Sequence, residues 1–364
     1  AFPMIALIYL GKKIRKDFPK GITFTQFIFH KIGKNLFKFI ILLSVFYMFV
    51  FLCAEITAVA ILINYISGAS LWITAALVIV TTLIYTLYGG LKASILTDNF
   101  QFLIIIILLL VCTNYIFSSD FISYKSITNN SAALLSIKYI PNYTAGLTFF
   151  IAVAATNLFH QGNWQRVYAA KNIKVLKKSL IISFFIIIPI VFFMGFSGLI
   201  AVSVNSDVIP DLAFFSLLLK EQAVPIAVVL IILSISLTIS SIDTLINAIS
   251  SLILVDGNKI LKFKGDYLKL SKNIIILLSI IAFAVSSRGI SILYLFLLAD
   301  LLCCSAVLSI FYSFYNKKIN ERNAYIAILL GLFLGLLFFP SPDFSRSILI
   351  GVLFPISSFP VFMS

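Results

Sequence analysis

Side-chain oxygens recur along one face of the helix that the sequence predicts at residues 223–254. They follow one another at steps of three or four residues, which places them on a single helical face. Hydroxyl and amide oxygens can bind a hard cation such as sodium, and they can also form hydrogen bonds between neighbouring membrane helices. The spacing alone leaves both interpretations open. The residues are Ser236, Ser240, Thr244, Asn247 and Ser251, with Ser241 and Asp243 beside them.

A second polar segment, YTLYGGLKASILTDNFQ at residues 85–101, separates two long apolar runs. Its glycine pair predicts a break between two helices. Ser94, Thr97, Asp98 and Gln101 share one face of the first two turns after that break. An acidic residue at a helix start is favoured by the helix dipole, and a carboxylate there can also attract a cation at the mouth of a membrane helix.

Four polar residues crowd the end of a helix predicted at 144–163: Asn157, His160, Gln161 and Asn163. Gly162 predicts a break in that helix, and a broken helix exposes backbone groups that a solute can use. An ordinary helix end before a basic loop explains the same pattern, with Arg166 as a cytoplasmic anchor.

Two acidic residues, Glu55 and Asp300, lie inside predicted apolar helices. An ionisable side chain in a membrane is costly unless it faces a cavity or has a partner. Each of the two therefore either lines a transport pathway or is hydrogen-bonded in a helix interface.

The elements that must position these residues are long apolar helices. The chain has 364 residues, of which 61% are hydrophobic and 11% charged, and its mean hydropathy is +1.12. Apolar runs of about 20 residues recur, each long enough to cross a bilayer, and they lack the alternation of β-barrel strands. We expect an all-α polytopic membrane protein with about ten complete transmembrane helices and an N-terminal stump. The predicted helices cover residues 1–10, 37–66, 70–88, 93–117, 144–163, 179–203, 223–254, 273–287, 289–313, 323–339 and 346–363.

The net charge of +14 is unevenly distributed, and this distribution predicts membrane orientation rather than nucleic-acid binding. Of the 27 Lys and Arg residues, 22 fall in segments that alternate with the helices onto one face. Basic loops mark the cytoplasmic side, so we expect a multi-pass protein of the plasma membrane, such as a bacterial inner membrane. The predicted cytoplasmic loops are 11–36, 89–92, 164–178, 256–272 and 314–322.

The four cysteines all lie inside apolar runs, without the spacing of a metal site or a disulfide framework. We interpret them as small core residues.

Three segments, in this order, resemble the sodium:solute symporter family, which includes bacterial sodium/proline, sodium/pantothenate and sodium/sugar cotransporters. They are YTLYGGLKASILTDNFQ, WQRVYAAKNIKVLKKS and ISSIDTLINAISSLILVD, and the resemblance covers nearly the whole chain. It implies a LeuT-like inverted-repeat transporter fold, with 37–66 as the third core helix and 289–313 as the tenth. A single transmembrane domain over residues 1–364 is expected, without the family's first core helix and most of its second.

The resemblance also implies roles for individual residues. Ser240 and Ser241 match the paired hydroxyls that bind the family's sodium ion. Asp98 matches the aspartate that supports ion binding and cytoplasmic release, and Thr97 belongs to the same motif. The remaining expected positions line the substrate pathway, and they are Asn157, His160, Gln161, Glu55 and Thr244.

The function that follows is secondary active transport, in which inward sodium flux drives uptake of a small organic solute by alternating access. The resemblance implies no enzyme activity, no cofactor apart from sodium as the coupling ion, and no nucleic-acid partner. A transporter-like membrane sensor, an inactive truncated remnant and a proton-coupled permease remain alternatives. The solute is not named by the sequence, although FHQGNWQRVYAA resembles urea and polyamine-type members slightly more than sugar members.

Overall fold

The computed structural model describes residues 1–119, 122, 124–221, 223–261, 265–315 and 320–342, and within them it contains helices and no strand. Among the described residues, six helical segments are long and apolar enough to cross a membrane. The expected all-α membrane architecture is therefore confirmed, whereas the expected number of about ten spans stays a prediction. The predicted helix at 346–363 lies outside the described residues. The elements are α1 (Phe2–Asp17), α2 (Thr25–Lys31), α3 (Lys34–Ser67), α4 (Leu71–Ser118), α5 (Tyr124–Asn130), α6 (Ala132–Leu135), α7 (Ile140–Phe159), α8 (Gln161–Ala169), α9 (Ile173–Val204), η1 (Pro210–Leu212), α10 (Ala213–Leu218), α11 (Val224–Val255), α12 (Gly257–Leu261), α13 (Tyr267–Ser286), α14 (Ile292–Tyr312) and α15 (Glu321–Leu337).

The helices α3, α11 and α14 form the centre of the bundle, and α4, α7, α13 and α15 pack around them. Most of the apolar spans of α3 and α14 are buried by neighbouring helices, whereas α11 also exposes apolar side chains such as Val228 and Ile232. Aromatic rings fill the space between α3, α7 and α8: Tyr47 contacts Phe159, and Trp164 stacks on Phe311 of α14. By contrast, α9 exposes much of its apolar surface, as expected of a helix at the lipid-facing side.

Residues 71–118 form one helical element, α4, without the loop that the sequence predicts between residues 88 and 93. A straight helix of 48 residues would be about 70 Å long. Both ends of α4 nevertheless lie near α10 and the start of α11. Ile66, just before α4, lines a pocket with Val224, and Tyr115, near the end of α4, donates a hydrogen bond to Glu221. The element therefore bends back on itself, and the two antiparallel halves expected from the sequence are joined without a loop.

The sequence predicts a break at Gly162, and the structure places the break between α7 and α8 two residues earlier, at His160. His160 has extended backbone, and its Nδ1 atom accepts a hydrogen bond of 2.9 Å from the backbone N–H of Gly162. The imidazole therefore caps α8, as side chains with an acceptor do at helix starts. Gly162 has a different purpose: a Cβ atom there would lie 2.7 Å from Thr244, so glycine permits close packing of α8 on α11.

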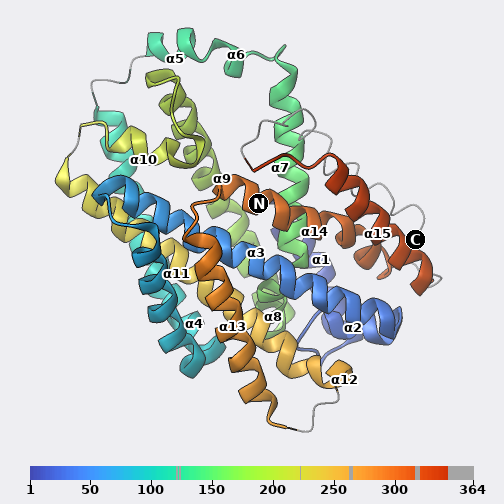
Figure 1. The fold of residues 1–364 in the computed structure, drawn as a ribbon. Helices are drawn as coiled ribbons and strands as arrows, with labels where there is room; N and C mark the ends of the chain where they lie inside the picture. Colours follow the sequence, from blue (N-terminus) through green and yellow to red (C-terminus); the bar gives the residue numbers. More distant parts are fainter. Residues whose placement is uncertain (120–121, 123, 222, 262–264, 316–319, 343–364) are drawn as a thin grey trace.

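Four of the five loops predicted to share one face meet at one end of the bundle. This end carries α2, α8 and α12, whereas α5, α6 and α10 lie at the opposite end (Figure 1). The first loop begins later than predicted, because α1 continues to Asp17 instead of ending at residue 10. Backbone and side-chain hydrogen bonds join the loops here: Arg15 to Val167, Thr23 and Thr25 to Asp256, and Lys31 to Phe314.

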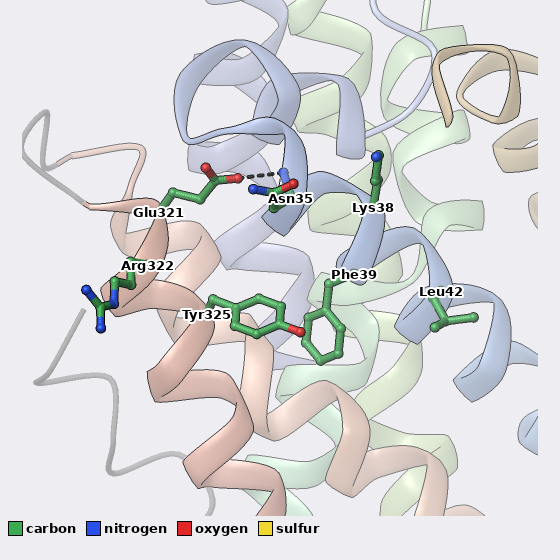
Figure 2. A pocket seen from close by; sticks show the side chains of 7 residues that line it. All are labelled: Asn35, Lys38, Phe39, Leu42, Glu321, Arg322 and Tyr325. Atoms are coloured by element: carbon green, nitrogen blue, oxygen red, sulfur yellow. Dashed lines mark hydrogen bonds between the residues drawn. The ribbon is translucent and has the colours of Figure 1, made fainter. Parts of the chain in front are cut away.

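The start of α3 is tied to α15 at the same end. Glu321 accepts hydrogen bonds from the backbone N–H groups of Asn35, at 2.6 Å, and Leu36, at 2.9 Å (Figure 2). These are among the N–H groups that a helix start leaves without an internal partner. The two helices line an open surface pocket of about 510 Å³ beside this contact, with Phe39 and Tyr325 on its walls.

Candidate functional site

The carboxylate of Asp98 lies between three helices. It stands on the second half of α4, and its Oδ1 atom accepts a hydrogen bond of 2.6 Å from the hydroxyl of Ser240 on α11. Its Oδ2 atom pairs with the guanidinium of Arg166 on α8, at 2.8 Å. Arg166, which the sequence predicts to be a cytoplasmic anchor, pairs with Asp98 on the polar face of the bundle, and its role as an anchor stays a prediction. The pairing of Arg166 with Asp98 has no signal in the sequence, because it depends on how α8 turns back after His160.

A second carboxylate, Asp243, lies one turn further along α11 and is fully buried. Its Oδ1 atom accepts hydrogen bonds from Ser94, at 2.9 Å, and Thr244, at 3.3 Å. The hydroxyl of Thr97 is 3.4 Å from Oδ2. The sequence places Asp243 only beside the polar face of its helix, because the shared face of Ser94 and Thr97 does not say which neighbouring helix they meet.

Thr244 links the two carboxylates through Arg166. Its hydroxyl donates a hydrogen bond to Asp243 and accepts one of 3.1 Å from Arg166, which pairs with Asp98. Oxygens from α4 and α11 thus converge on one small region beside a single guanidinium. We refer to Ser94, Thr97, Asp98, Ser240, Asp243 and Thr244 as the oxygen cluster. Carboxylate and hydroxyl oxygens are the donors that hard cations take, so the chemistry of the cluster fits sodium. The described residues contain no group of three or more His, Cys, Asp or Glu that could hold a metal of another kind.

The two serines of the expected sodium pair point to different partners. Ser240 bonds Asp98, whereas Ser241 bonds the backbone oxygen of Leu237, at 3.3 Å, and also interacts with Glu55 on α3. The serine pair therefore separates the oxygen cluster, on the α4 side of α11, from a second acidic position on the α3 side.

Asp300 belongs to a third polar position, between α14 and α7. Its carboxylate accepts a hydrogen bond from the hydroxyl of Thr156, and its side chain is almost completely buried. Neither Asp300 nor Glu55 takes part in a salt bridge among the described residues. Both carboxylates thus lie in the helical core beside hydroxyl groups.

Gln161 is fully buried and fastens three segments together. Its side-chain oxygen accepts a hydrogen bond of 3.2 Å from the N–H of Phe24, and its nitrogen donates to the carbonyl oxygen of Ile22. The same nitrogen lies 3.4 Å from the hydroxyl of Ser251 on α11. We call this arrangement the Gln161 clasp. It closes the bundle at the end where the basic loops gather.

Asn157 occupies the last turn of α7. Its backbone oxygen accepts a hydrogen bond of 2.8 Å from Asn163, which spans the break at His160. Of the expected lining positions, the structure thus brings Thr244 into the oxygen cluster and Gln161 into the clasp. Asn157 and His160 lie at the junction of α7 and α8.

The chain is similar to known membrane transporters in sequence and in fold. It is 27% identical over 346 residues to the spermidine transporter DUR31 of Candida albicans, covering 92% of this chain and 65% of that protein. Its structure is similar to that of a Na⁺-coupled sialic acid symporter solved in a substrate-bound outward-open state. That likeness has a TM-score of 0.73 at 19% identity, over 99% of this chain and 80% of the other. The model of the sodium:solute symporter family matches residues 3–331. The chain therefore belongs to the sodium:solute symporter family, as the three sequence segments indicated.

Proposed function

We propose that this protein takes up a small organic solute by coupling its entry to inward sodium flux. The observation that carries the proposal is the oxygen cluster, in which two carboxylates and four hydroxyls from α4 and α11 meet at one polar region. Membership of the sodium:solute symporter family supports sodium as the coupling ion. The chain makes or breaks no bond of the solute in this function, so we expect no enzyme activity.

Sodium is held, in this proposal, by Ser240 and Ser241 with support from Asp98 and Thr97. Asp98 lies toward the end of the bundle at which the basic loops gather. In this proposal its carboxylate attracts sodium as the ion leaves toward the cytoplasm. The solute pathway passes Glu55, Asn157, His160 and Thr244, and Gln161 closes it.

The orientation belongs to the same proposal. The basic loops meet at one end of the bundle, and basic loops remain on the cytoplasmic side of a membrane. We therefore assign loops 11–36, 89–92, 164–178, 256–272 and 314–322 to the cytoplasm. Sodium and solute enter from the opposite end, where α5, α6 and α10 lie.

We further propose that the solute is a polyamine or a similar organic cation. The relative with 27% identity is a spermidine transporter, and Glu55 and Asp300 place two carboxylates in the core near helix interfaces. Ammonium groups are attracted to such carboxylates, and a neutral sugar is not.

The test is uptake by proteoliposomes under an imposed sodium gradient. Labelled spermidine, proline, pantothenate, a sugar and sialic acid form the panel, and a proton gradient of equal size replaces sodium in a matched set. A membrane potential of 100 mV contributes about 2.3 kcal/mol per charge, so both sets are clamped at the same potential. Sodium-dependent accumulation of spermidine supports the whole proposal. Accumulation of another solute overturns the polyamine assignment, and uptake driven only by protons overturns sodium coupling. If no solute is taken up, the transport proposal fails, and the transporter-like sensor and the inactive remnant are the alternatives to consider.

A further inference from the structure

A basic cavity lies outside the transport pathway, between the end of α1 and the start of α9. It has a volume of about 700 Å³ and is lined by five cationic side chains: Lys12, Arg15, Lys16, Lys171 and Lys174. Three of them come from α1, and two come from the segment that leads into α9 and its first turn. No acidic side chain is among the described residues that line it.

This arrangement brings like charges together without a protein counter-charge. Lys12 and Lys16 are four residues apart on α1, a spacing at which equal charges destabilise a helix. Arg15 uses one nitrogen to bond the carbonyl oxygen of Val167, at 3.3 Å, which holds its guanidinium beside the α9 segment. Arginine carries further N–H donors. The cavity is therefore suited to an anion that accepts several hydrogen bonds, such as a phosphate group.

The surroundings of the cavity distinguish a lipid phosphate from a soluble one. The cavity lies at the end of the bundle where the basic loops gather, and it opens where α1 and α9 leave the apolar part of the protein. Ile173 at its rim is 40% exposed, and α9 continues with the exposed apolar side chains Ile181, Ile182 and Phe185. A ligand with an anionic head and an apolar tail fits the basic cavity and the exposed apolar side of α9 next to it.

We propose that the cavity between α1 and α9 binds the phosphate headgroup of an anionic phospholipid of the cytoplasmic leaflet, with its acyl chains along α9. Basic pockets between transmembrane helices on the cytoplasmic side bind anionic lipid headgroups in this way. The proposal does not depend on which solute or ion is transported.

The test compares the full chain with two double variants of equal charge, by native mass spectrometry after extraction from nanodiscs. Lys171→Gln with Lys174→Gln removes two cations of the cavity. Lys269→Gln with Lys272→Gln removes two cations from the start of α13, on the same predicted face, and serves as the control. Each protein is reconstituted in phosphatidylglycerol mixed with phosphatidylcholine, and the bound lipid is identified by mass.

We expect the unaltered chain and the control to retain phosphatidylglycerol, and the Lys171/Lys174 variant to retain it roughly tenfold less, since each cation near a membrane surface strengthens binding severalfold. Equal retention by all three proteins overturns the proposal. A second arm adds inorganic phosphate in detergent and follows thermal unfolding. If phosphate alone stabilises the unaltered chain as strongly as phosphatidylglycerol does, and the Lys171/Lys174 variant loses this effect, the cavity binds a soluble anion and the lipid assignment is wrong.

Discussion

Arg166 and Asp98 form an ion pair of 2.8 Å between α8 and α4, although 68 residues separate them in the chain. The same carboxylate accepts a hydrogen bond from Ser240. In this arrangement the guanidinium neutralises the carboxylate that is expected to attract sodium. In the proposed function, a sodium ion that approaches Asp98 competes with Arg166, and we expect release of the ion to be favoured when the pair forms again.

Replacement of both serines tests the expected sodium pair. Ser240→Ala with Ser241→Ala removes one hydroxyl bonded to Asp98 and one beside Glu55. We expect the sodium concentration for half-maximal uptake to rise about tenfold or more, since a lost hydrogen bond to a charged group is worth about 1.5–3 kcal/mol. Sodium-dependent uptake in proteoliposomes measures this. The control is Ser234→Ala on the same helix, since the hydroxyl of Ser234 donates a hydrogen bond to the backbone oxygen of Ile231 in its own helix. Unchanged sodium dependence in the double variant, at normal expression, would remove these serines from the site.

Asp98→Asn tests the competition between Arg166 and sodium. The amide keeps the shape of the side chain but loses the charge that pairs with Arg166 and attracts the ion. We expect the rate of transport to fall more than the affinity for the solute, because release is expected to depend on this carboxylate. Maximal uptake rate and solute binding are measured on the same preparation.

A double variant separates the ion pair from the ion site. Arg166→Gln added to Asp98→Asn removes the unpaired guanidinium that the single variant leaves behind, and it should restore thermal stability without restoring transport. If both transport and sodium dependence stay normal in Asp98→Asn, Asp98 is only a residue at the start of the second half of α4.

Asp243 offers a test of the part of the oxygen cluster that sequence reasoning did not identify. Asp243→Asn removes a buried charge held by the hydroxyls of Ser94 and Thr244. We expect the sodium concentration for half-maximal uptake to rise severalfold, since a carboxylate attracts the ion more strongly than an amide. The exposed Asp207 provides the matched control as Asp207→Asn. An equal response of the two variants would show that Asp243 has a packing role alone.

Glu321 is expected to stabilise the start of α3. Glu321→Ala leaves the N–H groups of Asn35 and Leu36 without their carboxylate acceptor. A cost of about 1–3 kcal/mol is expected for the loss of hydrogen bonds to a charged group, seen as a lower midpoint of thermal unfolding in detergent. Arg322→Gln, at the next position, leaves both bonds intact and should change the midpoint little. A Glu321→Ala protein that unfolds at the same temperature as the unaltered chain would contradict this assignment.

The sequence predicts the long helices well and the contacts between them poorly. The helices at 37–66 and 223–254 are predicted from apolar runs long enough to cross a membrane. The structure contains both as α3 and α11, with ends within a few residues of the prediction. The glycine pair at 89–90 predicts a loop, whereas the structure assigns residues 71–118 to one helical element whose two ends lie near each other. At the α7–α8 break, a histidine that caps the following helix determined the boundary, and Gly162 served close packing.

The polar contacts depend on tertiary geometry. Asp98 and Ser240 are 142 residues apart in the chain, and only the family resemblance gives both of them a role in sodium binding. The partners of Arg166 and Asp243 could not be predicted, because each depends on the rotation of two helices about their own axes. A helical face identified by spacing says which residues point the same way, but it does not say which neighbour they meet.

The Gln161 clasp has a consequence for the way in which this end of the protein opens. One amide holds two backbone groups of the segment at 22–24 and a hydroxyl of α11. A small separation would break these bonds before it admitted water, and buried polar groups without partners are costly. Opening is therefore cooperative: the three segments part together or stay together. We therefore expect a carrier with this property to spend little time in a half-open state.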